Sequence, residues 1–145
     1  MKTVIFACVH NAGRSQMAAA FFNALADPSK ARALSAGTEP ASGVHPEVIG
    51  AMQEHGLDLS SNAPQRLTDE MAQTADLLVT MGCGDACPHV PGLRRDEWPL
   101  ADPKSQPPDR VREIRNEIRA RVLALLAKEG WQEAGSESGP HPPRT

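Results

Sequence analysis

The sequence of 145 residues lacks several features that would place it in other classes of protein. No apolar run approaches the roughly 20 residues that a helix needs to span a bilayer, so we expect no membrane association. The 15 basic residues are outnumbered by 18 acidic ones and form no stripe, which argues against a nucleic-acid partner. Three cysteines are too few for a disulfide-stapled scaffold.

The first nine residues also lack the marks of a secretory signal, because they are few and carry no small-residue cleavage site. We therefore expect a cytoplasmic protein, in which thiols stay reduced and the cysteines are reactive. The length suits one domain with its own hydrophobic core, which we expect over residues 1–131. The tail at 132–145, rich in Gly, Ser and Pro, is expected to be disordered.

Predicted strands and helices alternate along the chain. The apolar run at 4–7 predicts a strand buried on both faces, and the Ala-rich segment at 16–26, opened by Ser15, predicts a helix. Further strands are predicted at 31–36 and 76–81, and further helices at 46–55, 69–74 (capped by Thr68) and 109–128. This order indicates an α/β fold in which a parallel sheet has helices on both faces and binds ligands beyond the carboxyl ends of its strands.

The strongest motif is CVHNAGRS at residues 8–15, between the first strand and the first helix. A loop that feeds a helix N-terminus aims backbone N–H groups and the helix dipole at one point, and such a nest binds a tetrahedral oxyanion. Arg14 can clamp two anion oxygens, and the same field favours the nucleophilic thiolate of Cys8, to which Ser15 can donate a hydrogen bond. The predicted anion-binding residues are Val9, His10, Asn11, Ala12, Gly13, Arg14 and Ser15.

Two residues of this motif suit its backbone, because Asn11 and Gly13 tolerate the unusual angles of a tight loop. As an alternative, Cys8 could be a small buried hydrophobic residue at a strand end. An arginine six positions later, where a helix begins, favours the reactive role instead.

Residues 8–15 resemble the catalytic loop of the low-molecular-weight protein tyrosine phosphatases, and the continuation through Ala18 is more similar to the arsenate reductases that share that fold. The resemblance extends from residue 2 to about 126. It implies one three-layer domain with a four-stranded parallel sheet, with Cys8 as the nucleophile. It also implies that Asp102, in an Asp-Pro motif, is the general acid, with Asp96 and Glu97 as the alternatives nearby.

Two further cysteines favour reductase over phosphatase. Arsenate reduction moves two electrons and leaves a disulfide, and Cys83 and Cys87 resemble the redox pair of thioredoxin-coupled arsenate reductases. The resemblance implies arsenic detoxification by a disulfide cascade through Cys8, Cys83 and Cys87, with no cofactor and with thioredoxin or another thiol reductant as partner. The main alternative is a tyrosine phosphatase or other phosphomonoesterase, but such phosphatases usually carry tyrosines after the Asp-Pro motif, and this chain has no tyrosine.

Other interpretations of these cysteines remain open. A zinc site at Cys83, Cys87 and His89 lacks an evident fourth ligand and the usual paired spacing. The two cysteines could also be inert, or the chain could be an oxyanion-binding or redox-sensing module without turnover.

The chain departs from the family pattern in two ways. Some members bind potassium through an Asn, a Glu, a Ser and an Asp. Asn11 and Ser35 are present, but Ala19 stands at the Glu position and Gln65 near the Asp position, so no potassium site is predicted. Only three residues separate the two later cysteines, fewer than in the best-known thioredoxin-coupled members, which leaves the reductant open.

Overall fold

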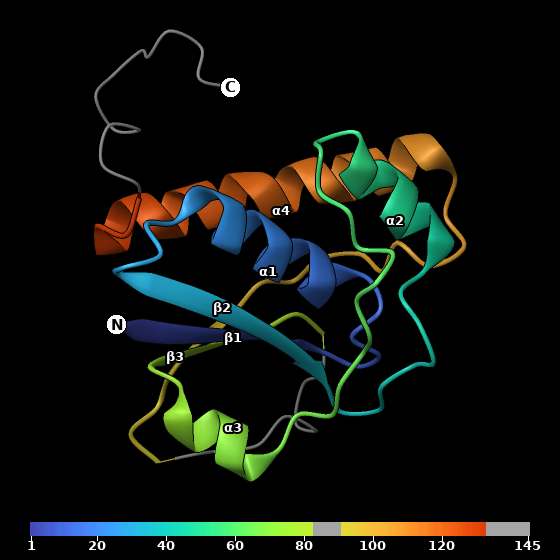
Figure 1. Cartoon of the computed structure of the whole chain (residues 1–145). Helices are drawn as coiled ribbons and strands as arrows, with labels where there is room; N and C mark the ends of the chain where they lie inside the picture. Colours follow the sequence, from blue (N-terminus) through green and yellow to red (C-terminus); the bar gives the residue numbers. More distant parts are fainter. Residues whose placement is uncertain (83–90, 133–145) are drawn as a thin grey trace, which may run out of the picture.

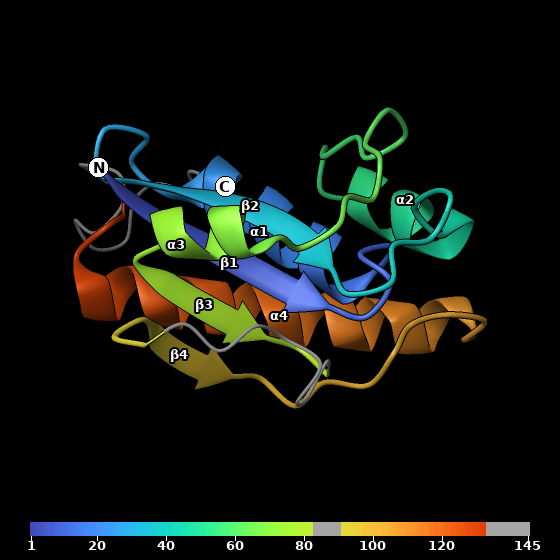
Figure 2. The same ribbon diagram turned by 90° about the horizontal axis from the view of Figure 1, so that it is seen from below.

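The computed structural model describes residues 1–82 and 91–132. Four parallel strands form one sheet in the order β2-β1-β3-β4, with β4 at the edge (Figure 2). The strands are β1 (Lys2–Cys8), β2 (Ala31–Gly37), β3 (Leu77–Thr80) and β4 (Arg94–Glu97). The helices are α1 (Arg14–Leu25), α2 (Pro46–Gln53), α3 (Asp69–Thr74) and α4 (Pro108–Glu129). The predicted α/β class and four-stranded parallel sheet are confirmed.

Helices cover both faces of the sheet, with α1, α2 and α4 on one face and α3 on the other (Figure 1). Successive side chains of β1 point to opposite faces of the sheet. Phe6 and Cys8 belong to the larger core with α1 and α4, whereas Ile5 and Ala7 belong to the smaller core. Phe6 is fully buried and its ring lies 5.4 Å from that of Trp98, so its burial stabilises the fold by roughly 1.5–3 kcal/mol and fixes the strand that ends at Cys8.

Most element predictions are confirmed, including the start of α2 at Pro46 and the Thr68 cap, whose hydroxyl accepts from the Met71 N–H at 3.1 Å. The four-stranded sheet was expected from the resemblance, but the position of β4 was not predicted, because Arg-Arg-Asp-Glu on an exposed edge shows no apolar alternation. The expectation that Ser15 opens the first helix was wrong by one residue, since α1 begins at Arg14. In the described ranges, no helix is long and apolar enough to cross a membrane.

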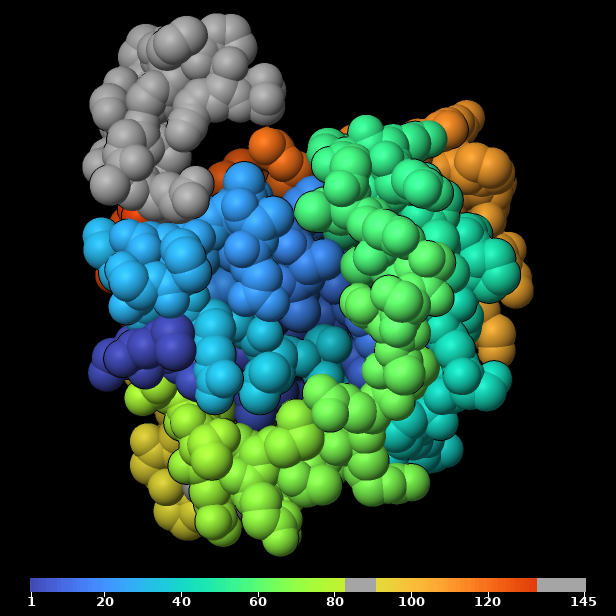
Figure 3. Space-filling model, in the orientation of Figure 1, coloured from blue at the N-terminus to red at the C-terminus, as the bar shows by residue number. Residues whose placement is uncertain are grey.

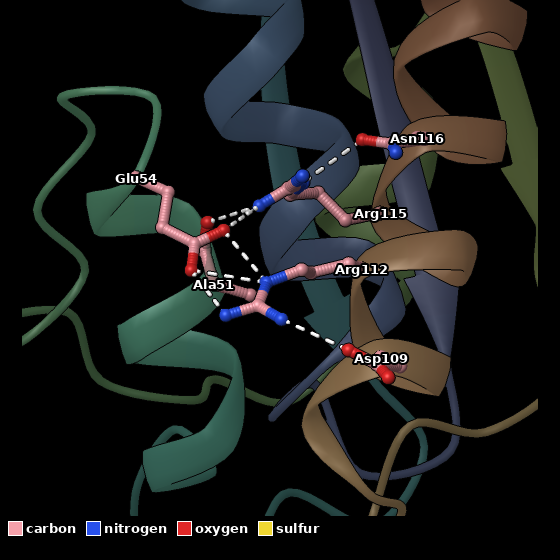
Figure 4. Close-up of polar contacts among 6 residues, drawn as sticks. All are labelled: Ala51, Glu54, Asp109, Arg112, Arg115 and Asn116. Carbon is pink, nitrogen blue, oxygen red and sulfur yellow. Dashed lines mark hydrogen bonds and ion pairs between the residues drawn. The ribbon is translucent and has the colours of Figure 1, made fainter.

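The helix α2 is fixed on α4 by Glu54, which lies just beyond its last residue (Figure 4). Arg112 donates to this carboxylate at 2.9 Å, and Arg115, which is buried, donates both to it and to the Ala51 carbonyl. Hydrogen bonds from Arg112 and then Arg115 lower the pKa of Glu54 to about 2. Arg112 also pairs with Asp109 at 3.1 Å, so one carboxylate and two arginines hold α2 in place.

Candidate active site

The carboxyl ends of β1, β3 and β4 lie side by side. Cys8 is the last residue of β1, and the N–H of Met81, just after β3, donates to the Ala7 carbonyl at 2.7 Å. The N–H of Trp98, just after β4, donates to the Thr80 carbonyl at 2.9 Å. The segments that follow these strands therefore start from one edge of the sheet, where the sequence predicted the site.

In the anion loop, residues 8–15, the backbone carbonyl groups are bonded to donors outside the loop. Every carbonyl from residue 8 to residue 13 accepts a hydrogen bond from outside that stretch. The donors are Thr38 N to Cys8 (3.2 Å), Glu39 N to Val9 (2.7 Å), Ala41 N to His10 (2.9 Å), Gln16 Nε2 to Asn11 (3.0 Å), His45 N to Ala12 (2.9 Å) and Met17 N to Gly13 (3.0 Å). All described peptide bonds are trans, so the N–H of each following residue points the opposite way. The N–H groups of residues 9–14 therefore point away from those outer donors, the orientation that an anion nest requires.

Close packing fixes the shape of this loop. A β-carbon on Gly37, at the end of β2, would lie 2.6 Å from the Val9 oxygen and 2.9 Å from the Asn11 nitrogen, so only glycine lets the loop approach. Asn11 has the left-handed φ of 52° that its side chain tolerates, as predicted. Gly13 has φ −142° and ψ −92°, outside the helical and extended regions as predicted, and the Pro103 ring would lie 3.0 Å from a β-carbon there.

A chain of hydrogen bonds reaches the Cys8 sulfur. The backbone N–H of Gln65 donates to Asn11 Oδ1 at 2.9 Å, which turns Asn11 Nδ2 toward Ser15 Oγ at 2.8 Å. Because the Ser15 oxygen accepts from that amide, its own proton is free to point at Cys8 Sγ, 2.9 Å away. The predicted contact between Ser15 and Cys8 is confirmed, and Cys8 is buried.

Gln16 was missed by the sequence analysis. It is 4% exposed, and its Nε2 donates to both the backbone oxygen and Oδ1 of Asn11, at 3.0 and 3.2 Å. Its Oε1 accepts from Asn62 at 3.2 Å. A polar side chain in the first turn of an Ala-rich helix, directly after the anion loop, was the available signal.

At the positions where some family members bind potassium, the oxygen atoms of Asn11 and Ser35 accept hydrogen bonds from amide N–H groups. Asn11 Oδ1 accepts from Gln65 N–H and from Gln16, and the Ser35 carbonyl accepts from Gln65 Nε2 at 2.9 Å. Gln16, Ser35 and Gln65, with Ala19, line a pocket between α1 and residues 62–65, whose position can be followed in Figure 3 between the blue atoms of α1 and the green segment. Among the described residues, no carboxylate lines that pocket.

The structure brings Arg14 and Asp102 together. Arg14 Nη1 donates to the Leu100 carbonyl at 3.1 Å, and Nη2 lies 3.8 Å from Asp102 Oδ2. Asp102 Oδ1 accepts from the Lys104 N–H at 3.0 Å, which holds the carboxylate back over its own loop. The Asp102 side chain is 47% exposed and that of Arg14 only 12%, so Asp102 stands at the entrance and Arg14 inside it.

The two alternative carboxylates lie on β4, away from this entrance loop. Asp96 accepts from the Trp98 indole at 3.2 Å and from the Glu97 N–H at 2.9 Å. Trp98 is 4% exposed and packs on Phe6, so its role in the core is structural. Asp102 is therefore the carboxylate that the described contacts associate with Arg14.

Cys83, Cys87 and His89 lie outside the described residues, which end for this segment at Gly82. Gly82 itself has φ 107° and lies against the Arg14 guanidinium. Within 1–82 and 91–132, no group of three or more His, Cys, Asp and Glu side chains could hold a metal ion.

Comparison with known proteins relates this chain to a family. A family model described as low molecular weight phosphotyrosine protein phosphatase matches residues 3–134. A glutaredoxin arsenate reductase from Synechocystis is 35% identical over 131 residues, which cover 88% of this chain and 98% of that protein. A solved thioredoxin-dependent arsenate reductase from Corynebacterium glutamicum is 39% identical with a TM-score of 0.76 over 88% of this chain, which spans 61% of that protein's length. A solved arsenate reductase in a phosphate-binding state is 32% identical with a TM-score of 0.73, covering 88% of this chain and 98% of that one.

Proposed function

This chain belongs to the low-molecular-weight phosphotyrosine protein phosphatase family, and on that premise we propose that it is an arsenate reductase, serving arsenic detoxification. Identities of 35% and 39% to proteins named as arsenate reductases support this choice within the family. The absence of tyrosine supports it as well, because tyrosines after the Asp-Pro motif usually shape the entrance for a phosphotyrosine ring.

The observation that carries the proposal is the direction of the peptide groups in the anion loop. Six carbonyls are bonded to donors outside the loop, so the six N–H groups that follow them point away from those donors and can meet an oxyanion beside Cys8 at the N-terminus of α1. Arsenate and phosphate share the tetrahedral shape and the charge that such a nest binds. Arg14 exchanges its bond to the Leu100 carbonyl for two bonds to the oxyanion.

The first chemical step forms the bond between Cys8 and arsenic. The Cys8 thiolate, to which Ser15 donates, attacks arsenic(V), and one arsenic–oxygen bond breaks. Asp102 donates a proton to the departing oxygen, which leaves as water. A covalent adduct of Cys8 and arsenate remains, with no change yet in the oxidation state of arsenic.

The second step moves the electrons. The Cys83 thiolate attacks the Cys8 sulfur, and the pair of electrons in the sulfur–arsenic bond stays with arsenic, which leaves as arsenite(III). Cys87 then attacks Cys83, expels the Cys8 thiolate and leaves a Cys83–Cys87 disulfide. Gly82, the neighbour of Cys83, lies against Arg14, which supports this order because Cys83 follows the residue that touches the anion loop.

A dithiol reductant completes the cycle by opening the Cys83–Cys87 disulfide. The relatives name both thioredoxin and glutaredoxin, so the chemistry required is that of a thiol reductant of either type. The loop and Asp102 also suit phosphate esters, so a slow phosphomonoesterase side activity is part of the proposal.

The decisive experiment is steady-state release of arsenite from arsenate in the presence of a thioredoxin system, with a glutaredoxin and glutathione system as the second arm. Continuous release supports the reductase. Release of phosphate from an aryl phosphate without any arsenite would make the chain a phosphatase, and binding of arsenate without either product would make it a sensor or carrier.

Three cysteine variants assign the steps. Cys8→Ser is expected to abolish arsenite release and the phosphatase side activity, whereas Cys83→Ser keeps the latter and loses internal reduction. Cys87→Ser should release about one arsenite per enzyme and then stop, since a Cys8–Cys83 disulfide is shielded from a protein reductant. Turnover of Cys87→Ser at the wild-type rate would remove Cys87 from the mechanism.

A further inference from the structure

The loop that carries Asp102, residues 101–106 and here named the acid loop, is attached to the rest of the described fold at two further places besides the Arg14 contacts. One is Pro103, which is buried against Gly13 of the anion loop. The other is Glu47, in the first turn of α2, whose Oε2 accepts from the Ser105 N–H at 2.6 Å across 58 positions of sequence.

The Glu47 contact holds a backbone turn that would not form readily by itself. Ser105 has a φ of 60°, in the left-handed region, which costs a non-glycine residue about 1–2 kcal/mol. Its N–H reaches Glu47 in that conformation, and Gln106 N–H closes the turn on the Pro103 carbonyl at 3.1 Å. Removing the acceptor at Glu47 would leave the strained residue without its long-range hydrogen bond.

The carboxylate at Glu47 is ionised at neutral pH. Its pKa is lowered first by its own backbone N–H at the start of α2, and further by the Ser105 N–H and by His45, while burial and the charge of Asp102 oppose this. A hydrogen bond to an ionised acceptor is shorter and roughly twice as strong as a neutral one. Helix α2, which carries Glu47, is itself held in place, because Glu54 just beyond its C-terminal end is bonded to α4.

We propose that Glu47 is a positioning residue that holds the acid loop over the anion loop and thereby places Asp102 for proton transfer. This inference rests on the proposed function, in which Asp102 is the general acid. Glu47 touches neither the oxyanion nest nor Cys8 in this arrangement, so it acts through Asp102 and affects the chemical step rather than binding of the anion.

The test measures the first turnover, with reduced enzyme, a range of arsenate concentrations and no external reductant, so that recycling does not limit the rate. Glu47→Ala is expected to lower the rate of arsenite release about tenfold, part of the 10²–10⁴-fold that a general acid contributes. The half-saturating arsenate concentration should change less than about twofold, because the nest is intact. Glu47→Gln keeps an acceptor oxygen and should retain at least about half of the rate.

Controls separate positioning from stability. Glu113→Ala removes an exposed carboxylate of α4 that pairs with Arg110, and it should keep the wild-type rate. Asp102→Asn should be slow, and Glu47→Ala should add no further loss in that background, a result that a merely structural role of Glu47 would not give. If Glu47→Ala fails to fold, Glu47→Asp keeps the charge but shortens the reach by one methylene, and it should also be slowed.

The outcomes separate failure of the positioning role of Glu47 from failure of the proposed function. A wild-type rate for Asp102→Asn would overturn the assignment of the acid in the proposed function. A slow Asp102→Asn with a wild-type rate for the Glu47 variants would overturn the positioning role alone. Equal losses from Glu47→Ala with and without Asp102 would do the same, because Glu47 would then act independently of the acid.

Discussion

The backbone of Gly82 lies against the guanidinium of Arg14, so closely that a β-carbon on Gly82 would come within 2.7 Å of Nη1 and 3.4 Å of Cζ. The φ of Gly82 is 107°, which side-chain-bearing residues rarely adopt. Glycine is therefore required at position 82 for two reasons. It allows the turn after β3, and it leaves Arg14 the space to lie over the anion loop.

The first prediction is that Gly82→Ala weakens oxyanion binding. The new methyl group displaces Arg14, whose charge-assisted hydrogen bonds are worth about 1.5–3 kcal/mol, so phosphate affinity should fall about tenfold or more by calorimetry. Gly92→Ala is the matched control. It imposes similar backbone strain at φ 84°, but no atom of the described residues would lie within 4 Å of its β-carbon, so it should bind phosphate as the wild type does. Equal losses in both variants would mean that strain, rather than the Arg14 contact, is responsible.

The second prediction compares two glycines in regular structure. Gly37→Ala forces a methyl group against the Val9 oxygen, so we expect about 1–3 kcal/mol of destabilisation together with weaker phosphate binding. Gly50→Ala, within α2 and with open space around it, should stabilise the protein by about 0.5–1 kcal/mol through helix propensity. Urea unfolding gives both values, and a Gly37→Ala protein as stable as the wild type would contradict the packing argument.

The third prediction concerns Glu54, whose pKa falls from 4.5 to about 2 in the folded protein. A carboxyl group with a depressed pKa contributes stability that is complete above its unfolded value and is lost as the pH falls through the folded value. The wild type should therefore exceed Glu54→Gln in thermal midpoint above pH 5, and the difference should shrink steadily from pH 4.5 to pH 2. Glu117→Gln, which removes an exposed partner of Arg121, should show little difference at any pH. If the difference in thermal midpoint between the wild type and Glu54→Gln stays constant from pH 7 to pH 2, the ionised Glu54 is not its source.

Local chemistry explains what the sequence revealed. The apolar run of β1, the Pro46 start of α2 and the Thr68 cap depend on neighbours in sequence, and each was predicted. The tight loop between β1 and α1 was predicted for the same reason, since its residues are contiguous, and its binding of an anion stays a prediction.

Long-range contacts explain what the sequence did not reveal. β4 has no apolar pattern because it is an exposed edge strand, and it forms because β3 offers it backbone partners. The bond between Glu47 and Ser105 spans 58 positions, and nothing in the local sequence around either residue marks it. The contact of Gly82 with Arg14 likewise depends on how β1 and β3 are paired.

The last prediction is that potassium has no specific effect on this protein. Asn11 Oδ1 and the Ser35 carbonyl are bonded to amide donors of Gln16 and Gln65, and a cation would have to displace those donors without a carboxylate to offset its loss of hydration. Replacing sodium chloride by potassium chloride at constant ionic strength should therefore leave the thermal midpoint and the rate of arsenite release unchanged.

The measurement is sensitive enough to decide the question. A cation bound with a Kd one hundredth of its concentration would add about 2.7 kcal/mol, which raises the midpoint by several degrees in a domain of this size. The double variant Ala19→Glu with Gln65→Asp supplies the carboxylates that potassium-binding members carry, in the pocket that both positions line. The thermal midpoint of this double variant should be higher in potassium chloride than in sodium chloride. A potassium-specific rise in the wild type would instead show that the amide donors around Asn11 give way to the ion.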